Sequence, residues 1–272
     1  MEHPYVTLSQ GKTRYHETGP KDGKPVLLLH GMAMSLFVWE NIVPALVDAG
    51  YRVIRYDLFG RGLSAKPAID YTQDVFEQQL LEMLDHLNVD QPIALFGTSM
   101  GGAVVTHFTH KHPERVERLG LIAPAGMPFH VPWIVKLGQS PTISSLFMRL
   151  FGDTILHRSV SKSFLQPSQH PEFREEFAKQ LKDPGFHGAV LSSIRHMPLH
   201  EMEETYKAVG KLNIPTFLAW GKKDQIVPYS THEKVLNAIP HATFVSLDEA
   251  GHVPHYERPE IITPPLLEFL QS

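Results

Sequence analysis

The chain contains no cysteine among its 272 residues, which excludes disulfide bonds and thiolate catalysis. It also lacks an apolar stretch long enough to span a bilayer. Residues 1–5 show no basic region followed by an apolar run, and this argues against a signal peptide. The missing cysteines do not decide the compartment, but the missing leader leads us to expect a cytoplasmic protein without stable membrane insertion.

An excess of positive charge is missing as well. The 25 Lys and Arg residues are outnumbered by 29 Asp and Glu residues, giving a formal net charge of −4. This balance argues against a nucleic-acid partner. The chain has 42% hydrophobic and 20% charged residues, the balance of an ordinary soluble protein. Its length suffices for one α/β domain with a sizeable core and a modest insertion.

Short apolar runs alternate along the chain with segments of helical spacing. The alternation predicts a mainly parallel eight-stranded sheet flanked by helices. Strands are predicted at residues 5–8, 12–17, 25–29, 52–56, 92–96, 119–123, 216–220 and 243–247, the first two being edge strands joined by a turn at Gly11. Helices are predicted at residues 39–47, 71–87, 231–238 and 259–270, with another running from residue 102 toward Pro113.

Residues 127–199 interrupt this alternation. The segment mixes aromatic and apolar residues with proline and serine breaks, and it is much longer than an ordinary crossover connection. We interpret it as a helical cap inserted after the sixth strand, over the carboxyl ends of the strands. Residues 1–126 and 200–272 then form the core domain. The alternative is a pair of long crossover helices in the main layer.

A serine stands between two glycines in Gly97-Thr98-Ser99-Met100-Gly101, directly after the apolar run at 92–96. A side chain two residues before or after the serine would crowd a tight turn, whereas glycine has no such cost. The pattern predicts a sharp strand-to-helix turn with an exposed hydroxyl at the positive end of the helix. Without context, the same string would also fit an ordinary glycine-rich turn.

A serine hydroxyl becomes a strong nucleophile only when a base takes its proton, and that base needs an orienting acid. Asp224 follows the predicted strand at 216–220, and His252 follows the one at 243–247. Both positions lie at strand carboxyl ends, where open α/β sheets bind ligands. His255 competes with His252 for the role of base. Two acidic residues compete with Asp224, but they stand too close to His252 in the chain to approach its ring easily: Asp248 and Glu249.

Several motifs in this order resemble the α/β-hydrolase family, in its cap-bearing serine esterase branch. They are His30-Gly31 after a strand, Asp57-x-x-Gly60-x-Gly62-x-Ser64, the serine turn, Gly221-x-x-Asp224 and Gly251-His252. The resemblance covers nearly the whole chain outside residues 127–199. It implies that Ser99 is the nucleophile, His252 the general base and acid, and Asp224 the orienting carboxylate.

The same resemblance implies an oxyanion hole made of two backbone N–H groups. One belongs to Met100, which follows the serine, and the other to Met32, after His30-Gly31. His30 is expected to support that loop by hydrogen bonding. An apolar substrate pocket is predicted from the two methionines together with Phe129, Trp133, Ile134, Leu137 and Val253.

Two further patterns invite other interpretations. The Asp57–Ser64 loop lacks the lysine and the serine or threonine that end a phosphate-binding loop, so we expect a structural loop held by Asp57. His107, His110 and His112 lie near the end of one predicted helix. They are more typical of solvent-facing helix-end residues than of ligands, so we predict no metal site and no cofactor.

The predicted function is hydrolysis of small-molecule carboxylic esters, with short or medium acyl chains or a monoacylglycerol as substrate. A carbon–carbon bond hydrolase of ring-fission products uses the same triad, and so do perhydrolases. The former would bind an acidic substrate through arginines such as Arg149, Arg158 or Arg195. Epoxide hydrolases and haloalkane dehalogenases normally have an aspartate where Ser99 stands. A non-catalytic receptor on this fold is a further alternative, and the sequence leaves the oligomeric state open.

Overall fold

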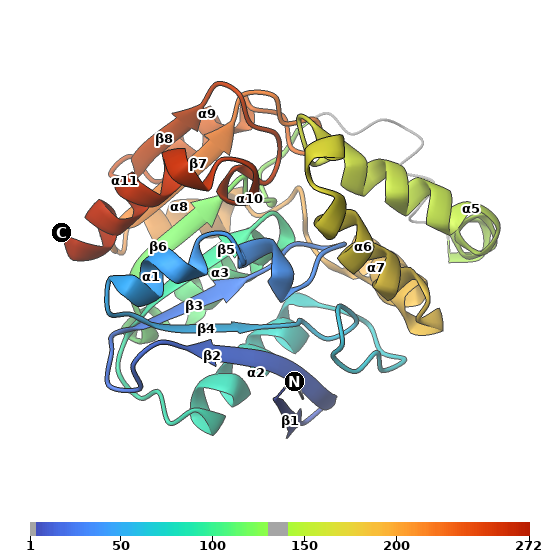
Figure 1. Cartoon of the computed structure of the whole chain (residues 1–272), viewed down its shortest axis with the longest axis horizontal. Coiled ribbons are helices and arrows are strands. Elements are labelled where there is room, and N and C mark those ends of the chain that lie inside the picture. Colours follow the sequence, from blue (N-terminus) through green and yellow to red (C-terminus); the bar gives the residue numbers. More distant parts are fainter. Residues whose placement is uncertain (1–3, 130–140) are drawn as a thin grey trace.

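A computed structural model describes residues 4–129 and 141–272, apart from the side chains of residues 141–143, 145–147 and 149. A twisted central sheet carries helices on both faces, and a further helical segment lies beside it (Figure 1). In the described ranges, no helix is both long and apolar enough to cross a membrane.

The sheet has eight strands in the order β1-β2-β4-β3-β5-β6-β7-β8, which confirms the predicted fold class. β1 and β2 pair antiparallel at one edge, β2 pairs antiparallel with β4, and the remaining pairs are parallel. The strands are β1 (Tyr5–Leu8), β2 (Gly11–Thr18), β3 (Pro25–Leu29), β4 (Arg52–Tyr56), β5 (Ile93–Thr98), β6 (Val116–Ile122), β7 (Thr216–Gly221) and β8 (Thr243–Leu247).

The core lies on both faces of the sheet because its central strands are covered on both sides. Leu27 and Leu29 of β3 belong to one apolar cluster, and Val26 and Leu28 belong to the other. This alternation explains why the strand reads as one continuous apolar run. One cluster is closed by α2 (Gln73–His86), α3 (Met100–Lys111), α8 (Glu203–Gly210) and α9 (Thr231–Ala238), and the other by η1 (Leu36–Trp39), α1 (Val43–Asp48) and α11 (Pro259–Gln271).

The single helix predicted at residues 39–47 is wrong. The chain instead forms the 3₁₀ helix η1 and, after a break, the short helix α1. Pro44 sits in the first turn of α1. Its ring would clash with the carbonyl group four residues earlier, so a helix cannot continue through it from residue 39. The described part of the chain also contains the short elements η2 (Pro113–Arg115), η4 (Pro167–Gln169) and α10 (Pro254–Glu257).

Among the described residues between β6 and α8, the chain forms longer helices. These are α5 (Pro141–Lys162), α6 (Pro171–Leu181) and α7 (Pro184–His196). They pack on one another and lie to one side of the sheet, where α6 also contacts η1 (Figure 1). We refer to them as the α5–α7 segment.

Asp57 holds the loop that follows β4. Its Oδ1 accepts a hydrogen bond from the Leu36 N–H at 2.8 Å, and its Oδ2 accepts one from the Leu63 N–H at 2.8 Å. Arg14 Nη1 lies 3.6 Å from the same carboxylate, which is fully buried. The hydroxyl of Ser64 donates to the Asp57 carbonyl at 2.6 Å. The loop is therefore the structural one that the sequence predicts.

We expect Asp57→Ala to lower the free energy of unfolding by about 3 kcal/mol, because the buried N–H of Leu36 and the partly buried N–H of Leu63 lose a charged acceptor. Urea unfolding followed by circular dichroism measures this loss. Asp70→Ala is the matched control, since that side chain is 74% exposed, and it should change the free energy by less than about 0.5 kcal/mol. Equal losses in the two variants would contradict the role given to Asp57.

Candidate active site

Ser99 occupies the turn between β5 and α3 in a conformation that non-glycine residues rarely adopt. Its φ is 54° and its ψ is −122°. Neighbouring backbone holds it there: the Ser99 N–H donates to the Ile122 carbonyl at 3.0 Å, and the Ser99 carbonyl accepts from the Ala125 N–H at 2.9 Å. Its side chain stays partly exposed. Strain of this kind clusters at functional sites, where the surrounding structure maintains it.

The two flanking glycines are needed for close backbone approach, as predicted. A Cβ on Gly97 would collide with the Gly101 carbonyl oxygen. A Cβ on Gly101 would lie 2.6 Å from the carbonyl oxygens of both Leu29 and His30. Glycine at these positions lets the start of α3 rest directly on the ends of β5 and β3.

Asp224 and His252 meet beyond the ends of β7 and β8. His252 Nδ1 and Asp224 Oδ2 are 2.7 Å apart, and both side chains are almost wholly buried. Asp224 Oδ2 also accepts from the Trp220 indole N–H at 3.2 Å. Its Oδ1 accepts from the N–H groups of Ile226 and Val227 at 2.7 and 3.0 Å. Asp224 is thus held on both oxygens while it orients the imidazole ring.

His252 Nε2 is left available. It is buried, and it has no hydrogen-bond partner among the described residues, Ser99 included. The structure therefore brings Asp224 and His252 together at the sheet edge where Ser99 stands, without a hydrogen bond from the serine to the imidazole. Such bonds are often long before substrate binds and tighten in the reacting complex.

The other candidates for the acid and the base make different contacts or face solvent. The Asp248 carboxylate is 75% exposed and forms an ion pair with Lys222 at 2.7 Å. Glu249 is exposed. The His255 ring is fully buried and packs against the Trp39 ring, with centroids 4.2 Å apart. Burial, together with the nearby His252, lowers the pKa of His255 to about 3.

His30 organises the loop that carries Met32. The Leu58 N–H donates to His30 Nε2 at 2.9 Å, so the ring proton is on Nδ1, which donates to the Gly31 carbonyl at 2.8 Å. Burial lowers the pKa of His30 to about 4, which keeps the ring neutral. A trans peptide points its N–H away from its carbonyl group. Holding the Gly31 carbonyl therefore directs the Met32 N–H to the opposite side.

Two backbone N–H groups thus stand free near Ser99. A Cβ on Gly31 would lie 3.1 Å from the Cβ of Ser99, which places the Met32 loop beside the serine. Met100 begins α3, where N–H groups have no acceptor within the helix. In the described ranges, neither N–H donates a hydrogen bond. The arrangement offers donors for developing negative charge, with the positive end of the α3 dipole behind one of them.

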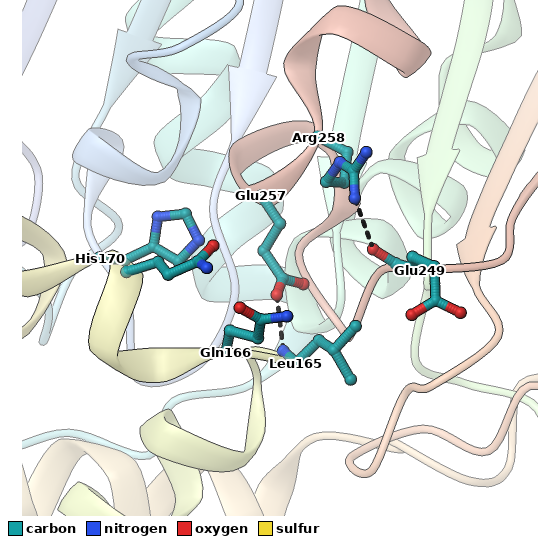
Figure 2. A pocket seen from close by; sticks show the side chains of 7 residues that line it. Leu165, Gln166, His170, Glu249, Glu257 and Arg258 are labelled. Atoms are coloured by element: carbon teal, nitrogen blue, oxygen red, sulfur yellow. Dashed lines mark hydrogen bonds between the residues drawn. The ribbon is translucent and has the colours of Figure 1, made fainter.

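Glu257 ties the loop of His252 to the α5–α7 segment. Its two carboxylate oxygens accept from the N–H groups of Gly251 and Leu165, each at 2.6 Å. The His252 N–H donates to the Ser163 carbonyl at 2.8 Å. Figure 2 shows the bond between Leu165 and Glu257, which both line a cavity of about 270 Å³ beside this loop. Burial raises the pKa of Glu257, and backbone N–H groups compensate its charge in part.

A family model described as the alpha/beta hydrolase fold matches residues 24–259. The chain belongs to the α/β-hydrolase family. Lipase 1 of Psychrobacter immobilis is 30% identical over 94% of this chain and 80% of the lipase. The 2-hydroxy-6-oxo-6-(2'-aminophenyl)hexa-2,4-dienoic acid hydrolase of Metapseudomonas resinovorans is 30% identical over 98% of this chain and 90% of that enzyme. A thermophilic esterase from Thermogutta terrifontis has a TM-score of 0.83 at 26% identity, covering 100% of this chain and 98% of the esterase.

These relatives confirm the predicted family. Because the chain belongs to the α/β-hydrolase family, it is a hydrolase. A lipase, an esterase and a dienoic acid hydrolase are similar to this chain at nearly equal sequence identities, between 26% and 30%. The family therefore does not select the substrate class for this chain.

The predicted pocket residues have different places in this hydrolase. Phe129 is partly buried and packs edge-on against His200, with ring centroids 4.5 Å apart. Val253 is fully buried in the core beside α11. Three other residues lie outside the described ranges: Trp133, Ile134 and Leu137. A second cavity, of about 400 Å³, is lined by α5 and α7, and Ser99 lines neither of the two cavities.

The histidines of α3 behave differently from one another. His110 is exposed, as predicted, but His107 and His112 are partly buried on either side of Glu77. Each places its Nε2 2.8 Å from one Glu77 oxygen. Asp74, Glu77 and His107 also offer ligand atoms within 4.8 Å of one another, so they could hold a cation. The hydrogen-bond contacts with Glu77 explain why both rings are partly buried.

Two residues that contact the site loops have no distinctive signal in the sequence. Glu257 is one of 29 acidic residues, and Arg61 stands in the Asp57–Ser64 loop, which the sequence predicts to be structural. The arginines singled out earlier are placed less favourably: Arg158 is exposed, Arg195 contacts Ser144, and the Arg149 side chain is outside the described set.

The two buried neutral histidines predict loss of stability in mild acid. His30 and His255 have pKa values of about 4 and about 3, against an ordinary value of 6.5. Below pH 6.5 the unfolded chain binds protons that the folded chain does not, so stability present above that pH is lost as the pH falls toward 4. Urea unfolding measured at several pH values should show this decline.

Each of these histidines should contribute roughly 1 kcal/mol per pH unit to the slope. His255→Phe keeps a ring against Trp39 and removes one titrating group, so its slope should be shallower by that amount. A slope identical to that of the unchanged protein would contradict the neutral, buried state of His255.

Proposed function

We propose that this α/β-hydrolase cleaves carboxylic esters through an acyl-enzyme formed on Ser99. The observation that carries the proposal is the strained serine turn at the start of α3, at the same sheet edge as the His252–Asp224 hydrogen bond of 2.7 Å. A serine, an imidazole with one free nitrogen and a carboxylate on the other nitrogen are the parts of a nucleophilic triad.

In the proposed reaction, Ser99 Oγ attacks the ester carbonyl while His252 Nε2 takes the hydroxyl proton. The tetrahedral oxyanion is held by the N–H groups of Met32 and Met100. His252 then gives its proton to the leaving alcohol, and the acyl-enzyme forms. A water molecule, deprotonated by the same nitrogen, attacks the acyl carbonyl, and collapse of the second intermediate frees the acid and Ser99.

The neighbours of His252 fit this cycle. Asp224 accepts a hydrogen bond from the Nδ1–H group and stabilises the imidazolium that forms during each step. The pKa of about 3 keeps His255 uncharged, so no second positive charge opposes protonation of His252. His30 is likewise neutral at physiological pH and maintains the loop of Met32. No step in this scheme requires a cofactor.

We further propose that residues 127–199 form the cap of this hydrolase, with the α5–α7 segment as its described part. This proposal is supported by the bonds of the segment to Glu257 and to the His252 N–H, which tie one end of it to the loop of His252. Similarity to a lipase and to an esterase supports ester substrates, and we propose short or medium acyl chains for them. We also propose that the protein acts in the cytoplasm and that its substrate is a small molecule.

Carbon–carbon bond hydrolysis is the second candidate. It is favoured by the 30% identity, over 98% of this chain, to a hydrolase of a dienoic acid. The same serine and histidine would serve that reaction. Comparing simple esters with a vinylogous diketo acid separates the two functions, because the carbon–carbon hydrolase should turn over the acid with the larger kcat/KM.

Ser99→Ala should lower kcat/KM for p-nitrophenyl butyrate by at least about 10³-fold, because it removes the nucleophile. Labelling by a fluorophosphonate probe should disappear with it. The circular dichroism spectrum should stay unchanged, since the side chain is small and partly exposed.

Ser246→Ala is the matched control, because it makes the same change at an exposed serine of β8. It should keep full activity and labelling. Activity retained by Ser99→Ala would overturn the proposed function. Absence of labelling in the unchanged protein would favour a non-catalytic binding role.

A further inference from the structure

Arg61 is a fully buried cation in the loop after β4. Its Nε donates to the Met32 carbonyl at 2.9 Å, and its Nη1 donates to the Phe59 carbonyl at 3.2 Å. Its Nη2 donates to the Ser193 hydroxyl at 2.7 Å and lies 3.8 Å from the Met100 sulfur. The guanidinium group therefore contacts both residues of the proposed oxyanion hole.

This cation has only neutral partners. Its guanidinium carbon lies 5.4 and 5.6 Å from the ring centres of Tyr71 and Phe76. Among the residues that the structure describes, no carboxylate forms an ion pair with it. Burial lowers the pKa of Arg61 to about 10, so the group is still charged at neutral pH. Burying such a charge costs several kcal/mol, and an apolar side chain would fill the same space without that cost.

The contact with Met32 restrains the backbone of the loop that carries the first oxyanion-hole N–H group. His30 holds the Gly31 carbonyl, which fixes the peptide plane before Met32. Arg61 holds the Met32 carbonyl, which fixes the plane after it. With both planes fixed, the two backbone dihedrals of Met32 cannot change, and its N–H keeps one direction. Catalysis by an oxyanion hole depends on this preorganisation.

The contact with Ser193 connects the same group to α7. Ser193 is fully buried, so the hydroxyl is a well-placed acceptor for Nη2. Nearby bonds seat the rest of the loop on α6 and α7: the Gly62 N–H donates to Gln180, and the Tyr71 N–H donates to the Ser192 hydroxyl at 3.0 Å. Displacement of α7 would remove one of the three oxygen acceptors of Arg61.

We propose that Arg61 is a positioning residue that makes the oxyanion hole dependent on the seating of α7, through the chain Ser193 Oγ, Arg61 and Met32. This inference rests on the proposed ester hydrolysis. Arg61 has no exposed surface, so it acts through Met32 and does not touch the substrate.

The experiment uses Ser193→Ala, with Ser192→Ala as the matched control on the same helix. Each variant loses one serine hydroxyl that bonds to the loop after β4, but only Ser193 bonds to Arg61. For each we would measure kcat and KM with p-nitrophenyl butyrate, the inhibition constant of a boronic acid and the melting temperature. The boronate forms a tetrahedral adduct on serine, so its affinity reports the oxyanion hole.

Ser193→Ala should lower kcat about 10-fold and weaken boronate binding by a similar factor, while KM changes less than about 3-fold. Ser192→Ala should lower the melting temperature comparably and keep kcat within about 2-fold. Arg61→Met should lower kcat about 100-fold, and Arg61→Lys should recover part of that loss, because an ammonium group can replace one donor but not the fork.

Unchanged kcat and boronate affinity in Ser193→Ala would overturn the inference, whether or not Arg61→Met folds. An equal kcat loss in Ser192→Ala would also overturn it, because that result reports general docking of α7. An unchanged protein that neither hydrolyses the ester nor reacts with a fluorophosphonate would refute the proposed function itself. The two failures are therefore distinguishable.

Discussion

Parallel pairing of strands is the constraint on which this site depends. β3, β5, β6, β7 and β8 run in the same direction in adjacent positions, so their carboxyl ends share one edge of the sheet. The residues that follow four of them are the His30-Gly31 loop, Ser99, Asp224 and His252. Groups as far apart in the chain as His30 and His252 are thereby brought to one place by backbone hydrogen bonds, before any side chain contributes.

Side chains then hold these loops through polar contacts that are buried and directional. His30 and Arg61 act on the two peptide planes around Met32, Asp57 secures the loop after β4, and Glu257 secures the loop of His252. Buried polar groups are costly when unpaired and rigid when fully paired. The site is consequently built from groups whose geometry has little freedom, and this suits a reaction that needs prearranged donors.

The sequence predicted the sheet well because buried parallel strands are short apolar runs with clear ends. β3, β4 and β8 begin and end at the predicted residues. The family motifs also brought Ser99, Asp224 and His252 to the same edge. The prediction of one helix at 39–47 was wrong. It followed the spacing of the apolar residues, whereas Pro44 determines where the helix can begin.

The polar contacts around the site could not be predicted in the same way. Arg61 bonds to residues 29 and 132 positions away, and neither partner has a distinctive local pattern. Serine and a main-chain carbonyl group occur throughout any chain, so only the folded arrangement shows which ones meet. The same holds for Glu257, because one of its partners, the Leu165 N–H, is 92 positions away in the chain.

The bonds from Ser163 and Leu165 to the histidine loop have a consequence for protein engineering. Segments between β6 and α8 are attractive units to exchange among family members when a new specificity is wanted. Here the acceptor for the His252 N–H and one donor to Glu257 both belong to the backbone of that segment. A transplanted segment would have to reproduce the path of this backbone at its junction, whatever its sequence, and so the two parts of the molecule are not freely interchangeable modules.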